Sequence, residues 1–111
     1  MKIKYEIKDN ELHINFDEMD LSWIHIDDAK TEVTRYMKAH AKEYKDIYIN
    51  CYNIMRIDSS GLGLFITIKR VQYDIDRELH QESDIFLSKP SESVLKIIEL
   101  VGIRNFFKIR E

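Results

Sequence analysis

Residues 47–64, IYINCYNIMRIDSSGLGL, decide how this chain folds. The first six are dense in strand formers and lie mid-chain, which predicts a central, mostly buried strand over 47–52. Asp58, Ser59 and Ser60 then predict a tight turn and a helix start, and we expect the helix to run past Gly61 to about residue 76. Serine oxygens at a helix start accept bonds from the first-turn amides, and the same amides attract phosphate. A serine here is therefore either a structural cap or a switch.

The N-terminal part predicts a hairpin followed by a helix. Apolar and polar residues alternate over 3–7 and 11–16, with the turn pair Asp9–Asn10 between them. A helix is expected from about 27 to 44. Its apolar stripe consists of Ala29, Val33, Tyr36, Met37, Ala41 and Tyr44.

The C-terminal part predicts a short apolar strand over 84–88, a last helix and a final edge strand over 106–109. Pro90 and Ser91 open the last helix and Gly102 closes it. The residues expected to face inward are Val94, Leu95, Ile98 and Val101. The element order is thus β-β-α-β-α-β-α-(β), in which strands separated by helices pair in parallel with right-handed crossovers.

Composition limits the class of protein. The chain has 111 residues, 44% apolar and 33% charged, which is typical of one globular domain. The net charge of -3, with no basic stripe, argues against nucleic acid as a partner. The single cysteine excludes an internal disulfide and suits a reducing cytoplasm. Neither a long apolar run nor a signal-peptide core is present, so we expect a cytoplasmic protein that makes no contact with a membrane.

Sites for metal, nucleotide or catalysis are poorly supported. None of the four histidines lies at ligand spacing from another histidine or from Cys51, which we expect to be a small core residue. Ser59 and Ser60 lack the Gly-x-Ser-x-Gly pattern of a nucleophile elbow. The segment 61–63, Gly-Leu-Gly, is only a fragment of a phosphate-binding fingerprint. An enzyme using these residues is therefore the weakest reading, and no metal or cofactor is predicted.

The second predicted helix begins with an excess of large apolar residues. Five of the seven residues over 62–68 are large and apolar, more than one buried helix face needs. Phe65 and Ile68 fit an inward face, continued by Val71 or Gln72. Leu62 and Ile66 then point to another side, and Leu64 is left undecided. Either part of this first turn meets a partner or a flanking helix covers it.

An exposed hydroxyl beside such an apolar surface suits a charge switch. Phosphorylation of Ser59 would add about -1.5 to -2 charges. The helix start tolerates the phosphate within the protein. A partner that had packed against this surface would not tolerate the phosphate. A loss of about 3 kcal/mol of binding free energy already lowers the affinity about a hundredfold.

Five segments resemble a known family. Residues 57–63, IDSSGLG, resemble the signature of STAS domains, specifically of bacterial anti-sigma factor antagonists. Residues 86–95, 100–103 and 106–109 are similar to the family's later strand, its helix and its closing segment. Residues 16–20, FDEMD, are similar to its Gly-Glu-Leu-Asp turn. The resemblance implies a single STAS-like α/β domain over 1–111, with a mixed four- to five-stranded sheet and helices packed mainly on one face.

The resemblance also implies a regulator and not an enzyme. The unmodified protein is expected to bind an anti-sigma factor that is also a serine kinase, and so to free a sigma factor. Ser59 matches the serine that this kinase phosphorylates, after which binding is lost and a PP2C-type phosphatase restores it. The expected partner contacts are Asp20, Asp58, Ser60, Gly61, Leu62, Leu64 and Ile66. The alternative is an unphosphorylated STAS interaction module of a transporter or sensor assembly.

The chain departs from the family pattern in three places. Asp17 stands where glycine is usual, so that turn must be built differently. The segment 77–84 lacks the usual glycine and is longer and more polar. The region 21–28 is also slightly longer. These changes could alter the partner without altering the fold.

Overall fold

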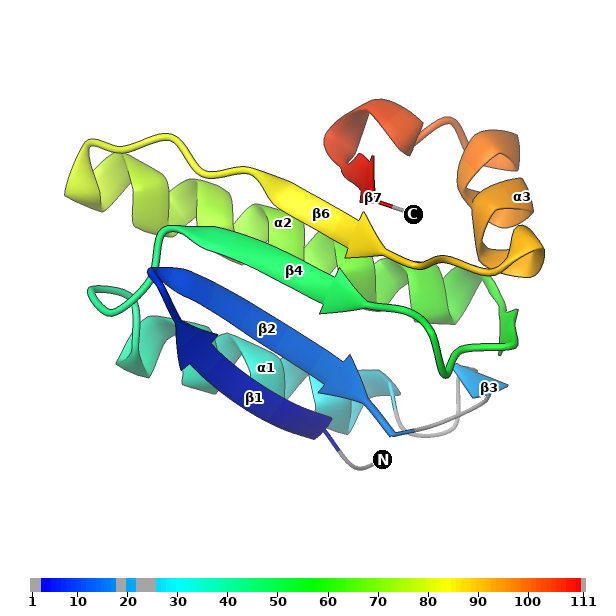
Figure 1. Ribbon diagram of the computed structural model, residues 1–111, viewed down its shortest axis with the longest axis horizontal. Helices are drawn as coiled ribbons and strands as arrows, with labels where there is room; N and C mark the ends of the chain where they lie inside the picture. Colours follow the sequence, from blue (N-terminus) through cyan, green and yellow to red (C-terminus); the bar gives the residue numbers. More distant parts are fainter. Residues whose placement is uncertain (1–2, 18–19, 22–25, 111) are drawn as a thin grey trace.

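A five-stranded mixed sheet forms the centre of the protein (Figure 1). The computed structural model describes residues 3–17, 20–21 and 26–110. The strand order is β1-β2-β4-β6-β7. The strands span Ile3–Lys8 (β1), Glu11–Phe16 (β2), Asp46–Asn50 (β4), Ile85–Ser88 (β6) and Lys108–Arg110 (β7). Strand β1 is antiparallel to β2, and the other neighbouring pairs are parallel, as expected.

The predicted N-terminal hairpin is confirmed. Asp9 and Asn10 both have positive φ, 53° and 68°, and so form the two-residue turn between β1 and β2. Asn and Asp tolerate this left-handed conformation better than most residues, which is why they occur in tight hairpin turns.

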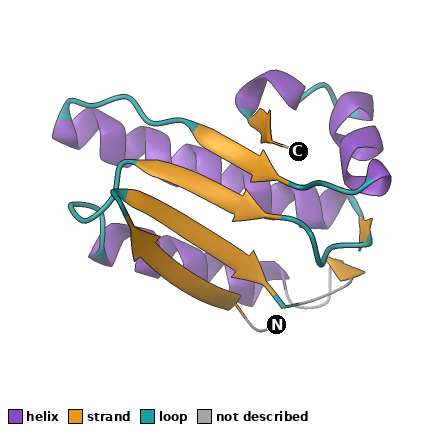
Figure 2. Cartoon of the chain, viewed as in Figure 1, coloured by secondary structure: helices purple, strands orange, loops and turns teal. Residues whose placement is uncertain are grey.

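The helices lie mainly on one face of the sheet, as predicted. Helices α1 (Ile26–Ala39) and α2 (Ser59–Leu79) lie side by side behind it, and α3 (Glu92–Leu100) lies beside strand β5 (Arg56–Ile57) (Figure 2). Residues facing the helices are buried, and Phe65 of α2 packs between Phe16 and Phe107, with 6.3 Å between ring centroids in each pair. None of the described helices is long and apolar enough to cross a bilayer.

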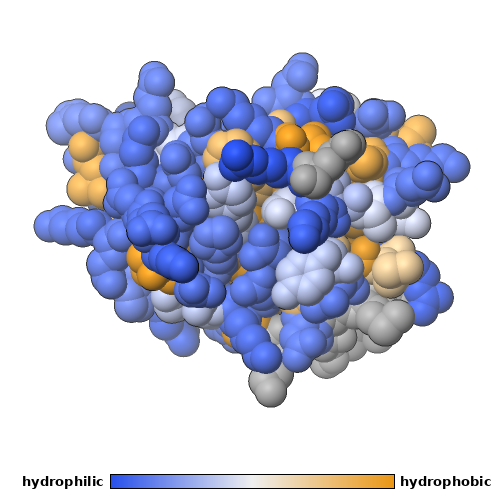
Figure 3. All heavy atoms as spheres, in the orientation of Figure 1, coloured by the Kyte–Doolittle hydropathy of each residue, from blue (hydrophilic) through white to orange (hydrophobic). Residues whose placement is uncertain are grey.

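The opposite face of the sheet is largely hydrophilic (Figure 3). Its rings form a ladder across neighbouring strands, with His13 stacked on Tyr48 at 4.8 Å and Tyr48 on Phe86 at 4.6 Å. Arg110 donates from a guanidinium nitrogen to the Tyr48 hydroxyl at 2.7 Å. The face of each ring stacks on the next ring, so the ladder stabilises the sheet and leaves mainly the ring edges exposed.

Helix α1 ends earlier than predicted. It stops at Ala39, and the chain turns through a bond from the Glu43 amide to the His40 carbonyl at 2.9 Å. Tyr44 therefore lies outside the helix, although it is buried as expected. Its hydroxyl donates to Gln72 Oε1 on α2 at 2.8 Å, so tertiary contact and not helix periodicity buries this ring.

Val101 does not face inward, contrary to the prediction. Its side chain is 47% exposed, and Ile103 is buried instead. The end of α3 forms a Schellman motif, in which Gly102 has φ 72° and the Ile103 amide bonds the Ile98 carbonyl at 3.2 Å. That motif turns the chain outward at Val101 and returns it to the core two residues later.

The segment 77–84 replaces the missing glycine with a histidine. His80 takes the left-handed conformation, φ 53°, that glycine usually provides after a helix. Gln81 bonds the Asp76 carbonyl through its amide at 3.0 Å, and its side chain donates to Asp76 Oδ1 at 2.9 Å. The Asp76 carboxylate also accepts bonds from Ser83, which fixes the polar loop before β6.

A second, two-stranded sheet was not predicted. Strand β3 (Asp20–Leu21) pairs in parallel with β5, with Asp20 opposite Arg56 and Leu21 opposite Ile57. Strands of two residues carry no alternation that a sequence pattern can show. The expected turn over 17–20 and the longer region 21–28 lie partly outside the described residues.

Candidate functional site

Asp58 caps helix α2, so of the two roles left open for the serines, structural cap or switch, the capping role belongs to the aspartate. Its backbone is extended, and Oδ1 accepts from the Gly61 amide at 2.9 Å. Its carbonyl accepts from the Leu62 amide at 3.0 Å. Ser59 and Ser60 become the first two helical residues. The carboxylate thus fills the capping role, and the serine hydroxyls are not required for it.

Ser59 presents its side chain to solvent at the helix start. It is exposed, whereas Ser60 is half-buried. Among the described residues, no hydrogen bond engages the Ser59 hydroxyl. Of the two serines, Ser59 is therefore the more accessible to a modifying enzyme.

The connection from β4 to β5 displays two large apolar side chains, which the sequence reasoning missed. Tyr52 is 55% exposed and Met55 is 52% exposed. The buried residues Cys51 and Ile54 hold this loop, through bonds from the Cys51 amide to the Ser88 carbonyl and from the Ile54 amide to the Cys51 carbonyl, both 2.9 Å. The sequence signal that could have identified them is the presence of two large apolar residues in a segment too irregular to be a strand. Both lie in the connection that leads into Asp58 and Ser59.

The small sheet brings the Asp20 segment next to the α2 start. Asp20 pairs with Arg56, two residues before Asp58. The two segments that carry the acids of the predicted site are therefore neighbours in space. The side chains of Asp20 and Leu21 lie outside the described part, so the contact role of Asp20 stays a prediction.

Leu62 and Leu64 are core residues, so their predicted contact with a partner is wrong for this structure. They are 2% and 0% exposed. Helix α2 packs on the sheet, on α1 and on β5. These elements together bury more than one face of the start of α2. Gly61 is also buried, and its amide serves the Asp58 cap. Of the apolar residues predicted to contact a partner, Ile66 alone stays partly exposed.

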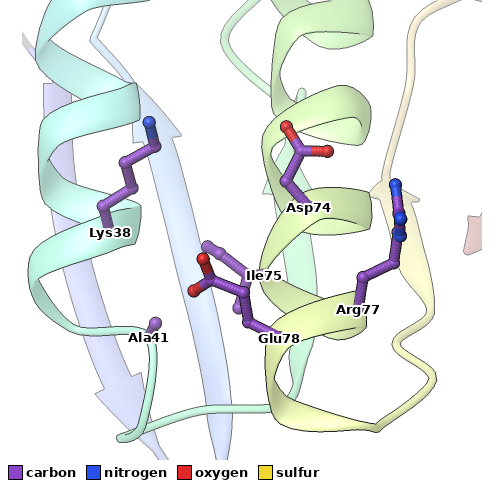
Figure 4. Close-up of a pocket in the computed structure, with 6 residues that line it drawn as sticks. All are labelled: Lys38, Ala41, Asp74, Ile75, Arg77 and Glu78. Atoms are coloured by element: carbon purple, nitrogen blue, oxygen red, sulfur yellow. The ribbon is translucent and has the colours of Figure 1, made fainter.

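A separate hollow lies at the other end of α2. It has a volume of about 650 Å³ and opens between the C-terminal halves of α1 and α2 (Figure 4). Side chains of both charges line it, namely Lys38, Ala41, Asp74, Ile75, Arg77 and Glu78. This groove is separate from the serine turn, which lies at the start of α2.

Cys51 is a core residue, as predicted. It is fully buried just after β4, and burial raises the pKa of its thiol to about 12. The thiol therefore stays protonated and unreactive near neutral pH. Within 3–17, 20–21 and 26–110, no group of three or more His, Cys, Asp or Glu side chains could hold a metal ion.

Known proteins share this architecture. No family model matches the chain. The anti-sigma-B factor antagonist of Staphylococcus aureus, in strains NCTC 8325 / PS 47 and COL, is 28% identical over 67 residues. That match covers 60% of this chain and 56% of the relative, so the chain matches little more than half of the curated protein.

Solved structures share this fold over almost the whole chain. A crystal structure of a putative anti-sigma factor antagonist from Thermotoga maritima, TM1081, has a TM-score of 0.69 at 18% identity and covers 98% of this chain and 86% of its own. Unphosphorylated SpoIIAA, an anti-sigma factor antagonist, has a TM-score of 0.68 at 16% identity, with 99% and 89% covered.

The fold is that of the anti-sigma factor antagonists. The resemblance to this STAS group is thereby confirmed, as is the mixed α/β sheet with helices mainly on one face. The relatives are named as antagonists of regulatory factors and not as enzymes.

Proposed function

We propose that this protein is an anti-sigma factor antagonist that works by switching partners. Unmodified, it binds an anti-sigma factor that is also a serine kinase. The kinase phosphorylates Ser59 and the complex dissociates, and a PP2C-type phosphatase reverses the change. The single observation that carries this proposal is the exposed Ser59 hydroxyl at a helix start that Asp58 has already capped.

The proposed docking surface surrounds that hydroxyl. It consists of Tyr52 and Met55 from the β4–β5 connection, Asp20 and Asp58, Ser60, and Ile66 further along α2. Gly61 contributes indirectly, because its amide holds the Asp58 carboxylate. Two exposed apolar side chains beside a polar rim are typical of an interface that buries a few anchors.

Phosphorylation acts on this surface by charge. The added group carries about -1.5 to -2 charges and lies beside the Asp58 carboxylate. The amides of the first helical turn stabilise the phosphate within the free protein. A docked partner would instead exclude water from the phosphate, which is costly for a charged group. We therefore expect the phosphorylated form to bind at least about a hundredfold more weakly, which corresponds to about 3 kcal/mol.

Mass spectrometry after incubation with the cognate kinase and ATP tests the modified residue. The wild type and Ser60→Ala should each gain one phosphate, on Ser59, and Ser59→Ala should gain none. Modification of Ser60 alone would falsify the assignment. Binding without modification of either serine would instead favour the unphosphorylated interaction module.

Binding titration tests the switch itself. Ser59→Asp should weaken the kinase complex strongly, whereas Ser59→Ala should bind like the wild type. Both variants should keep the wild-type thermal transition, because Ser59 is exposed and does not cap the helix. Equal affinity of Ser59→Asp and the wild type would argue against a charge-driven switch.

A further inference from the structure

Lys30 of α1 lies over Gly63 of α2. A Cβ added at Gly63 would lie 3.3 Å from Lys30 Nζ and 3.6 Å from Cε. The end of the lysine therefore occupies the space that a side chain at position 63 would fill. Glycine at this position permits the close approach of the two helices' side chains and backbone.

This geometry places the ammonium group one helical turn from Ser59 along α2. Residues 59 and 63 are four apart on α2, so they are neighbours on one helix face, with their Cβ positions about 5–6 Å apart. Cα–Cβ bonds in a helix tilt toward its N-terminus. The space beside a Cβ at position 63, where Lys30 Nζ lies, is therefore over the turn that contains Ser59 and Ser60.

The surroundings of Lys30 favour an anion. The positive end of the α2 dipole disfavours a cation at this helix start. In the described part of the chain, Lys30 makes no ion pair. A shallow depression beside it on α1 is lined by Lys30, Thr31, Thr34 and Arg35, which are two cations and two hydroxyls without an acid.

We propose that Lys30 pairs with the phosphate on Ser59. This inference rests on the proposed function, because it assigns a residue to the phosphorylated state of the same site. Phosphoserine has a second pKa near 6, so part of the group is still singly charged at neutral pH. A neighbouring ammonium lowers that pKa, raises the dianionic fraction near neutral pH and holds the phosphate at the helix start. Lys30 is thus a positioning residue for the switch.

Phosphorus NMR of the full chain, with phosphoserine installed at position 59 by codon reassignment, tests the pair without any kinase. The second pKa of the phosphate should lie about 0.3 to 0.6 below its ordinary value, the range for a partly exposed ion pair. Lys30→Gln should restore the ordinary value, and Lys30→Arg should keep the lowered one. Lys38→Gln, at the far end of α1, is the matched control and should change nothing.

The inference is overturned if Lys30→Gln titrates like the wild type, or if Lys38→Gln causes an equal change. Lys30→Met, which keeps the apolar stem, provides a second neutral variant should Lys30→Gln fold poorly. Because the phosphoserine is installed directly, these results do not depend on which residue the kinase modifies. The kinase experiment can fail while the ion pair is present, and the reverse also holds.

Discussion

Asp58 and Ser59 divide two roles between neighbouring side chains at the α2 start. The carboxylate accepts the Gly61 amide and the hydroxyl points to solvent. Asp58→Ala should therefore lower the free energy of unfolding by about 1 kcal/mol, the usual cost of a lost cap, and the melting temperature by about 4 °C. Ser59→Ala should leave both unchanged. Thermal and urea unfolding measure the difference, and a larger effect for Ser59→Ala would contradict the assigned cap.

The register of this cap shows a limit of sequence reasoning at the residue scale. Asp58, Ser59 and Ser60 are all good capping residues, so propensity could not choose between them. Pairing of β5 with β3 ends at Ile57, and the helix begins two residues later. Tertiary structure therefore selected Asp58, while the position of the turn itself was predicted correctly.

Ile66 is the remaining apolar contact predicted on α2. It is partly exposed, so Ile66→Glu should keep a cooperative thermal transition and impair docking of the kinase. Ile68→Glu is the matched control on the same helix, because Ile68 is fully buried and a charge there should abolish folding. A collapsed transition for Ile66→Glu would assign this residue to the core.

At the scale of elements, a buried polar bridge links the α1–β4 turn to α2. Tyr44 donates to Gln72 Oε1 at 2.8 Å, and Gln72 Nε2 donates to Asp76 Oδ1 at 2.8 Å. Burial first, and then the Asp76 charge, raises the pKa of Tyr44, so its hydroxyl stays a donor.

Tyr44→Phe should leave the Gln72 oxygen without its donor and lower the free energy of unfolding by about 1–3 kcal/mol. Tyr73→Phe on the exposed side of α2 should change it by less than about 0.5 kcal/mol. Urea denaturation at constant m-value measures both variants. Equal stability of Tyr44→Phe and the wild type would mean that water replaces the lost donor.

Elements with a local sequence pattern could be predicted, whereas features that depend on tertiary contacts could not. Long periodic segments such as α2 and the hairpin were predicted within a few residues. Helix α1 was extended too far because residues 40–44 continue its apolar spacing, although Tyr44 is buried by its contact with Gln72. The burial of Leu62 and Leu64 depends on how α1, β5 and the sheet surround α2, which no local pattern contains.

At the scale of the whole molecule, the core does not include the proposed switch. Buried side chains from the sheet and from all three helices form one cluster, and Ser59 lies outside it. Phosphorylation therefore requires no rearrangement of the fold in this proposal. The change in partner affinity follows from local charge at one end of a rigid scaffold.

Cys51 provides a reporter of that rigidity. The thiol is fully buried after β4, and burial raises its pKa from 9.0 to about 12. The neutral thiol is favoured by folding, so this contribution is complete below pH 9 and is lost as the pH rises toward 12. At pH 8, a thiol reagent should label the native protein only through global opening and the urea-unfolded protein at once. The Ser59→Asp variant should label as slowly as the wild type. Rapid labelling of this variant alone would show that negative charge at the helix start loosens the core, and the switch would then be conformational.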